Sequence, residues 1–147
     1  MAPRNLALKV RRAGVAAVNG YYKAMAHCIP DGFRSVCEAN KWETERTWSR
    51  LTDPDYLWFQ HIDNGSYVYW NKGDGQWWMD GPDGYGVYVA KTGNPLPPVS
   101  GWVALDEAKG AALPYVEVIE GQSLEKEQEK RRQEQIEQQE QQQKIDQ

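Results

Sequence analysis

Two histidines and two cysteines would be the most diagnostic chemical groups in this chain of 147 residues. His27, Cys28, Cys37 and His61 offer the nitrogen and sulfur ligands that zinc prefers. Their spacing fits neither a zinc finger nor a zinc ribbon, whose ligands pair about two to four residues apart. Cys28 beside His27 suggests a thiolate–base pair, but adjacent strand residues point apart and nothing visible orients the imidazole. We therefore predict no catalytic residue, no metal and no cofactor.

The two cysteines are too few for a disulfide framework. Free thiols in a reducing compartment are the expectation, with a single local disulfide left open.

Turn residues offer weaker chemical candidates, which local structure explains. The aspartates in question are Asp53, Asp55, Asp74, Asp80 and Asp83. They do not follow the EF-hand pattern, and aspartate is frequent in turns because it hydrogen-bonds its own backbone. The glycine patterns at 73–75 and 81–86 precede no predicted helix, so they are not phosphate loops. Asn64-Gly65-Ser66 is a formal glycosylation sequon that we interpret as a turn.

Charge and hydropathy exclude several classes of protein. A net charge of −4 and a pI of about 5.2 argue against a nucleic-acid binder, which usually presents excess Lys and Arg. No apolar run is long enough for membrane insertion, and residues 1–12 lack the apolar core of a secretory signal. We expect an intracellular, cytoplasmic protein, with association with an organelle or the cytoskeleton left open. The start of the chain, which lacks acidic residues before Asp31, is interpreted as a basic strand edge rather than a targeting remnant.

The elements that must position these groups centre on residues 56–90, where short aromatic runs alternate with turn signals. Asn64-Gly65 between apolar runs predicts a type I′ hairpin. The stretch predicts strands at 56–62, 67–70, 76–79 and 85–90, with turns at 63–66, 72–75 and 80–84.

Strand alternation assigns the aromatic side chains of this stretch to two faces. Tyr67 and Tyr69 share one face, and Val68 and Trp70 share the other. Trp77 and Trp78 must point to opposite faces, one into the core and one outward or under a loop. Trp (7) and Tyr (8) far outnumber Phe (2), and buried Trp and Tyr require hydrogen-bond partners, so the core should contain polar pairings.

The flanking segments extend the sheet. Residues 6–10 alternate as a strand, with a helix over 7–18 as the alternative, and residues 18–22 turn into a second strand. Residues 29–32 predict a turn, and residues 42–51 a strand with Trp48 inward. Residues 92–101 predict an extended proline-rich strap anchored by Trp102, followed by a loop or helical turn at 106–112 and a last strand at 115–119. The predicted fold is mainly β: a small antiparallel meander sheet or partly open barrel with a C-terminal polar α-helix.

A change of composition at Gly121 divides a module at 1–121 from a tail at 122–147 with ten Gln and six Glu. Ser123 is the predicted N-cap, and Glu127–Arg131 and Glu140–Lys144 are favourable i,i+4 pairs. Leu124, Ile136 and Ile145 keep no heptad register. The tail is therefore either a solvated single helix or a disordered segment that gains order by lying on a partner.

Several short motifs resemble a small β module that recurs in proteins of unicellular eukaryotes, often beside other interaction domains. The motifs are Val18-Asn19-Gly20-x-Tyr22, Tyr56-Leu57-Trp58, Trp77-Trp78, Tyr88-Val89 and Pro98-x-x-Gly101-Trp102. The resemblance covers about residues 8–119, and the segment 28–42 is longer than it implies. It implies no established activity.

The hypothesis that remains is a non-catalytic structural or scaffold subunit that docks on protein partners in a larger assembly. The alternative is a module that binds carbohydrate or another small ligand through exposed aromatic rings. The candidate binding residues are Trp77, Trp78, Trp70, Tyr67 and Trp102 in the module, and Leu124 and Ile136 in the tail. Trp and Tyr are favoured interface anchors, although most large aromatics are buried.

Overall fold

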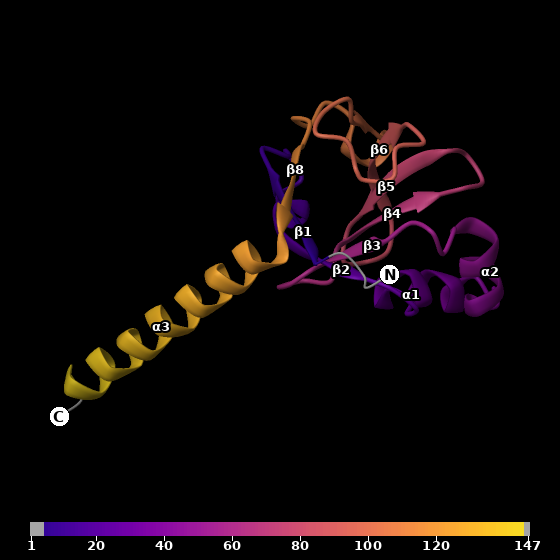
Figure 1. The fold of residues 1–147 in the computed structure, drawn as a ribbon. Coiled ribbons are helices and arrows are strands. Elements are labelled where there is room, and N and C mark those ends of the chain that lie inside the picture. The colour runs from indigo at the N-terminus through magenta and orange to yellow at the C-terminus, as the bar shows by residue number, and fades with distance from the viewer. Residues whose placement is uncertain (1–4, 146–147) are drawn as a thin grey trace.

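An eight-stranded antiparallel sheet forms the centre of the molecule in the computed structural model, which describes residues 5–145 (Figure 1). The strand order is β7-β6-β5-β4-β3-β2-β1-β8. The strands are β1 (Leu6–Arg11), β2 (Gly20–Met25), β3 (Trp58–His61), β4 (Tyr67–Asn71), β5 (Gln76–Asp80), β6 (Gly86–Lys91), β7 (Val103–Ala104) and β8 (Tyr115–Glu120). The sheet curls into a half-barrel, so the predicted mainly β class and antiparallel meander are confirmed. Arg4 of the basic start and the last two tail residues lie outside the described residues.

The strands predicted in the central stretch are present, with one difference in turn type. His61 N–H donates to Ser66 O (2.7 Å), so four residues, not two, lie between the hydrogen-bonded pair that closes the turn. Gly65 has a positive φ of 81° but Asn64 does not, and the predicted type I′ turn is therefore wrong. The strand at 6–10 is confirmed as β1, and a 3₁₀ turn at Ala16–Val18 leads into β2.

The inner face of the sheet carries the main hydrophobic core. Its largest fully buried side chains include Trp77, Tyr22, Tyr88 and Phe59, together with Trp102 from the segment after the strap. The strap at 92–101 crosses from β6 to the opposite edge of the sheet, where Val116 N–H donates to Val99 O (3.0 Å). The strap therefore lies between the two edge strands, β7 and β8, and covers the core.

Aromatic side chains hold the strap through their polar groups. Trp70, Tyr56 and Trp77 donate to the carbonyls of Thr92 (2.9 Å), Gly93 (2.7 Å) and Asn94 (3.1 Å), respectively. Trp102 Nε1 donates to Pro98 O (2.9 Å). The predicted strap, its anchoring by Trp102 and the polar pairings of the core are confirmed.

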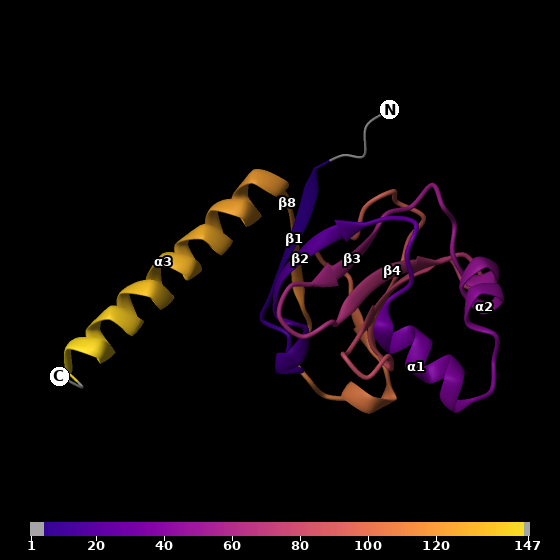
Figure 2. The same ribbon diagram turned by 90° about the horizontal axis from the view of Figure 1, so that it is seen from below.

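Two helices cover a second, smaller core on the outer face of the sheet. Phe33 and Cys37 of α1 (Asp31–Ala39) pack there with Trp58, Tyr67 and Tyr69 of the sheet. Trp48 of α2 (Thr44–Leu51) adds its ring, 5.5 Å from Tyr69 between centroids. Figures 1 and 2 show both helices on the side of the molecule remote from the C-terminal helix.

The predictions of a turn at 29–32 and a strand at 42–51 are wrong. Pro30 is the N-cap of α1, which begins at Asp31, because a fixed φ also suits the start of a helix. In α2, Thr44, Thr47, Trp48 and Leu51 are spaced three and four residues apart, which places them on one helical face. The alternation that suggested a strand is compatible with this helical period, and Trp48 points inward in either case.

The C-terminal helix α3 (Gly121–Ile145) follows β8 without a loop. Gly121 N–H donates to Asn5 O (2.7 Å), and a Cβ at Gly121 would lie 2.0 Å from Asn5 Oδ1. The helix therefore begins at the glycine, and the predicted N-cap at Ser123 is wrong. A second 3₁₀ turn lies at Asp106–Ala108. No helix within residues 5–145 is long and apolar enough to cross a membrane.

We predict that Trp77 and Trp78 differ sharply in their contribution to stability. Trp77 is fully buried in the main core, whereas Trp78 is half-buried on the other face and donates to Asp74 Oδ2 (2.9 Å). Trp77→Ala should lower the free energy of unfolding by about 3–5 kcal/mol, and Trp78→Ala by about 1 kcal/mol. Urea titrations of the two variants measure the difference, and equal losses would contradict the assignment of faces.

Candidate functional site

The root of α3 is fixed to the sheet by a single apolar anchor. Leu124 is 6 % exposed, and α3 contacts β8, β1 and β2. On the outer face of β1, Ala7 is fully buried, although its strand neighbours Leu6 and Leu8 point to the inner core. The helix is therefore joined to the module by packing as well as by the chain.

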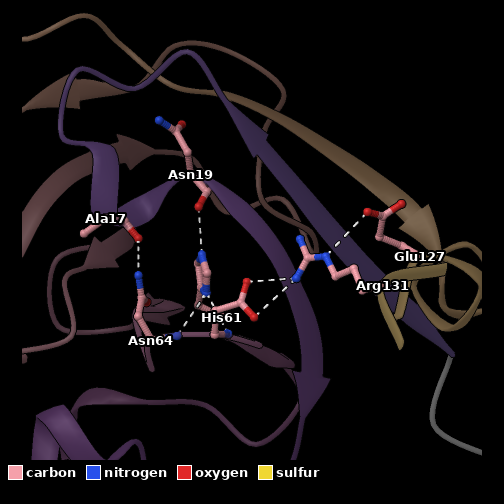
Figure 3. Close-up of polar contacts among 7 residues, drawn as sticks. Ala17, Asn19, His61, Asn64, Glu127 and Arg131 are labelled. Atoms are coloured by element: carbon pink, nitrogen blue, oxygen red, sulfur yellow. Dashed lines mark hydrogen bonds and ion pairs between the residues drawn. The ribbon is translucent and has the colours of Figure 1, made fainter. Parts of the chain in front are cut away.

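Farther along the helix, Arg131 forms an electrostatic latch with Asp63 in the β3–β4 loop (Figure 3). The guanidinium donates to both carboxylate oxygens, at 3.0 and 3.3 Å. It also pairs with Glu127 (3.5 Å) and lies 5.8 Å from the centroid of the Tyr21 ring. The hydrogen bond to Asp63 raises the pKa of Arg131 above its ordinary value, which keeps the latch charged.

His61 shapes the loop that presents Asp63. Its Nδ1 accepts the backbone N–H groups of Asp63 (3.0 Å) and Asn64 (3.3 Å). Its Nε2 lies 2.7 Å from Asn19 O and must be the donor, because a carbonyl oxygen only accepts. Asn64 Nδ2 donates to Ala17 O at 2.7 Å (Figure 3). The imidazole is thus a structural bridge between the loop and the segment before β2.

The close approach of His61 also explains the glycine in the Val18-Asn19-Gly20 motif. Gly20 has a φ of 132°, and a Cβ there would lie 2.5 Å from His61 Nε2. A side chain at this position would displace the imidazole. The glycine of the motif therefore allows His61 to pack against the start of β2.

Beyond the latch, α3 leaves the module. Every residue from Arg132 to Ile145 is exposed, and Ile136 is 46 % exposed. We call residues 133–145 the arm. The arm is about 20 Å long, at 1.5 Å per residue.

A second candidate surface is a cavity of about 350 Å³ at the end of the β3–β4 pair, which we call the aromatic cavity. The recorded β3–β4 pairs are Gln60–Tyr67 and Phe59–Val68. The cavity begins beyond these pairs. Leu57 and Trp58, at the start of β3, line one side, and Tyr69 and Trp70 of β4 line the other. The remaining lining residues are Ala26, His27 and Cys28 after β2, Trp48, Ser49 and Thr52 of and after α2, and Asp53, Pro54 and Tyr56 of the following turn.

Much of the polar chemistry of the aromatic cavity is already used within the protein. Trp58 Nε1 donates to Cys28 O (3.0 Å) and Thr52 Oγ1 to Trp48 O (2.6 Å). Trp70 and Tyr56 donate to the strap, and their rings stack at 4.2 Å with an interplanar angle of 8°. What the cavity offers to a ligand is therefore mainly ring surface.

A third unusual group is the buried carboxyl of Asp80 at the end of β5, opposite Tyr67 of β4. Its side chain is 4 % exposed, and within residues 5–145 its Oδ1 has no hydrogen-bond partner. Burial raises the pKa of Asp80 to about 8, although a hydrogen bond from Tyr67 lowers it in part. The group is therefore mostly protonated at neutral pH. The sequence placed Asp80 in a turn, and the structure corrects this to a buried strand end.

The other predicted site residues are dispersed. Trp77, Trp102 and Tyr67 are buried within the two cores, and Leu124 is the buried anchor of α3. Trp70 and Trp78 are half-buried on opposite faces, and Ile136 is exposed on the arm. Of these residues, only Trp70 lines the aromatic cavity.

The sequence did not identify the remaining walls of the cavity or the latch. The three- and four-residue spacing around Trp48 was the available signal for a helix that covers the sheet. The latch joins Asp63 to Arg131, which are 68 positions apart, and no local pattern could reveal that contact.

The cysteine, histidine and turn-aspartate candidates have ordinary surroundings. Both thiols are free, with Cys28 exposed and Cys37 buried. Burial raises the pKa of the Cys37 thiol, which disfavours the thiolate. Within the described residues, no group of three or more His, Cys, Asp and Glu side chains is arranged to hold a metal ion. Three turn aspartates, Asp53, Asp74 and Asp83, each accept the backbone N–H two residues onward, which confirms their role in turns.

No protein-family model, curated protein or solved structure matches this chain.

We predict that Leu124 is an energetic anchor, whereas Ile136 is not. Leu124→Ala should lower the free energy of unfolding by about 2 kcal/mol, because it removes a buried side chain. The matched change Ile136→Ala should alter it by less than about 0.5 kcal/mol, because Ile136 lies on the solvated arm. Chemical unfolding monitored by tryptophan fluorescence compares the two. A negligible effect of Leu124→Ala would contradict the anchored root.

A pH dependence of stability should follow from Asp80. Its pKa is raised on folding, so the protonated acid favours the native state at low pH. This contribution is lost as the pH rises from the unfolded pKa of about 4 toward about 8. The free energy of unfolding should fall by at most about 1.4 kcal/mol per pH unit over that window.

Asp80→Asn should remove this slope, since the amide does not ionise. Asp83→Asn in the neighbouring exposed turn should keep most of it, because burial, and not the nearby charge of Asp83, is the main cause of the raised pKa. Urea titrations over that pH window test both variants. The same slope in Asp80→Asn and the wild type would contradict the assignment.

Proposed function

We propose that this chain is a non-catalytic interaction module that docks in a larger protein assembly, with the arm of α3 as its docking element. The observation that carries the proposal is the contrast within α3. Its root is held by Leu124 and the Arg131–Asp63 latch, whereas the arm projects with every residue exposed.

The physical case begins with the stability of the arm. A short helix in water is marginal unless tertiary packing supports it. A helix that is polar all round persists through i,i+4 pairs or by bridging to another surface. The fixed root gives the arm a defined direction, and contact with a partner supplies the support that the module does not.

The chemistry of the arm defines the partner surface. Glu134, Glu137 and Glu140 lie three residues apart and so share one side of the helix. With Lys144 as the only basic residue among 133–145, the arm has three negative charges and one positive charge, a net charge of −2. We propose that the partner is a protein with a surface groove that receives the arm. Basic and polar groups line this groove, together with a small apolar site for Ile136.

The test compares two variants with the wild-type chain in the cells that express it. The first variant is a deletion of residues 133–147. The second is the full chain with Glu134→Gln, Glu137→Gln and Glu140→Gln. Both variants keep Leu124 and Arg131, so their thermal unfolding should match the wild type. We expect the deletion to lose its high-molecular-weight complex in native gels and co-purification, and the triple variant to weaken it, because charge complementarity is lost.

A third variant separates docking from solubilisation. Its residues 133–147 are scrambled, with unchanged composition. If the scrambled chain or the deletion still enters the complex at the wild-type level, the arm is not the docking element.

A second candidate function is that of a module that binds a small ligand, including carbohydrate. The specific observation that favours it is the aromatic cavity, whose volume falls at the lower end of the range for small-molecule sites.

A further inference from the structure

We propose that the aromatic cavity binds a small organic cation that carries a methylated ammonium group. This inference deepens the small-ligand candidate and is independent of any docking by the arm.

The walls of the aromatic cavity have the composition that such a cation requires. Five aromatic rings line it, from Trp48, Tyr56, Trp58, Tyr69 and Trp70. The π-face of an aromatic ring is electronegative, so a cation within about 6 Å of the ring centre is attracted to it. The attraction is greatest when water is excluded, and methylated ammonium groups match it because they shed water readily.

The five rings do not form a single stack: Tyr56 and Trp70 are parallel, and the others are inclined to one another. Trp48 is nearly perpendicular to Trp58, at 76° with centroids 5.9 Å apart. Trp48 and Tyr69 are tilted by 41° at 5.5 Å. The rings that line the cavity therefore differ in orientation, which suits a rounded, apolar cation better than a flat ligand.

The charges at the cavity agree with a cationic occupant. Asp53 is its only acidic lining residue, and neither Lys nor Arg lines it. Asp53 Oδ1 accepts the N–H of Asp55 (2.9 Å), which holds the carboxylate in the turn. Within residues 5–145 Asp53 forms no ion pair, so its charge is available to a ligand.

The same contacts disfavour a sugar. A sugar hydroxyl needs both donors and acceptors, but Trp58, Trp70, Tyr56 and Thr52 already donate to backbone carbonyls. A quaternary ammonium group has no N–H to donate and requires ring faces and a negative charge, both of which remain.

A free small molecule is the source that the volume favours. A space of about 350 Å³ is lined by the module itself and accommodates a molecule of the size of choline. We therefore assign the site to a soluble quaternary ammonium compound rather than to a methylated lysine of another protein.

The experiment titrates the full chain with choline and with its neutral analogue, in which a tert-butyl group replaces the trimethylammonium group. Both fill the same space, so the comparison isolates the charge. Quenching of tryptophan fluorescence and calorimetry report binding. We expect choline to bind about tenfold or more tightly than the analogue, since a tenfold ratio corresponds to about 1.4 kcal/mol of cation–π and ionic attraction.

Two substitutions locate the site without disturbing a core. Asp53→Asn should weaken choline binding about fivefold and leave binding of the neutral analogue unchanged. Trp42→Ala is the control, because Trp42 is 54 % exposed and does not line the cavity. It should leave choline binding unchanged.

Three results would overturn the proposal. Equal affinity for choline and its neutral analogue would show an apolar pocket without selectivity for charge. Tighter binding of glucose than of choline would indicate a carbohydrate site and would keep the small-ligand function. No binding of any probe would reject the small-ligand function as well. A peptide with trimethyllysine that binds more tightly than choline would reject the assignment to a free small molecule.

Discussion

The fold depends on one requirement: the N–H and O–H groups of buried Trp and Tyr must find acceptors. The chain has seven tryptophans and only two phenylalanines, so a purely apolar interior is not available to it. Trp70, Trp77, Trp102 and Tyr56 meet the requirement by donating to strap carbonyls. The proline-rich strap cannot form a sheet ladder, and its carbonyls are therefore free to accept. The aromatic N–H and O–H groups gain acceptors, and the strap carbonyls gain donors. The strap is thereby held over the curled sheet.

The predictions from the sequence succeeded where the signal is local. Alternation and turn residues identified the meander, and the faces of Tyr67, Tyr69, Val68 and Trp70 followed from strand parity. They failed where two periods overlap. In residues 42–51 both the alternating and the helical pattern place Trp48 inward. The segment is a helix because it packs on the outer face of the sheet. That face carries Tyr67 and Tyr69, and a strand at 42–51 would have left it without a cover.

The candidate sites were less accessible to sequence analysis because they depend on contacts between distant segments. The latch requires Asp63 and Arg131, and the sequence gives Arg131 an equally good partner in Glu127 within the helix. The aromatic cavity lies where the pairing of β3 with β4 ends, and the residue types of two predicted strands do not show where their pairing ends. The tail, in contrast, was expected to be polar and helical with few anchors, and α3 is helical from Gly121 to Ile145.

The two candidate surfaces lie on different parts of the molecule and share no residue. The arm leaves from the edge of the sheet formed by β8 and β1, remote from α2 (Figures 1 and 2). The aromatic cavity is lined by residues of α2 and of the β3–β4 pair at the centre of the sheet. However, β3 connects them, because it contributes Trp58 to the cavity and ends at His61, which shapes the loop that holds Arg131. The strand β3 is therefore common to the wall of the cavity and to the support of the loop that pairs with α3. Both surfaces can be occupied at once, since no residue is shared between them.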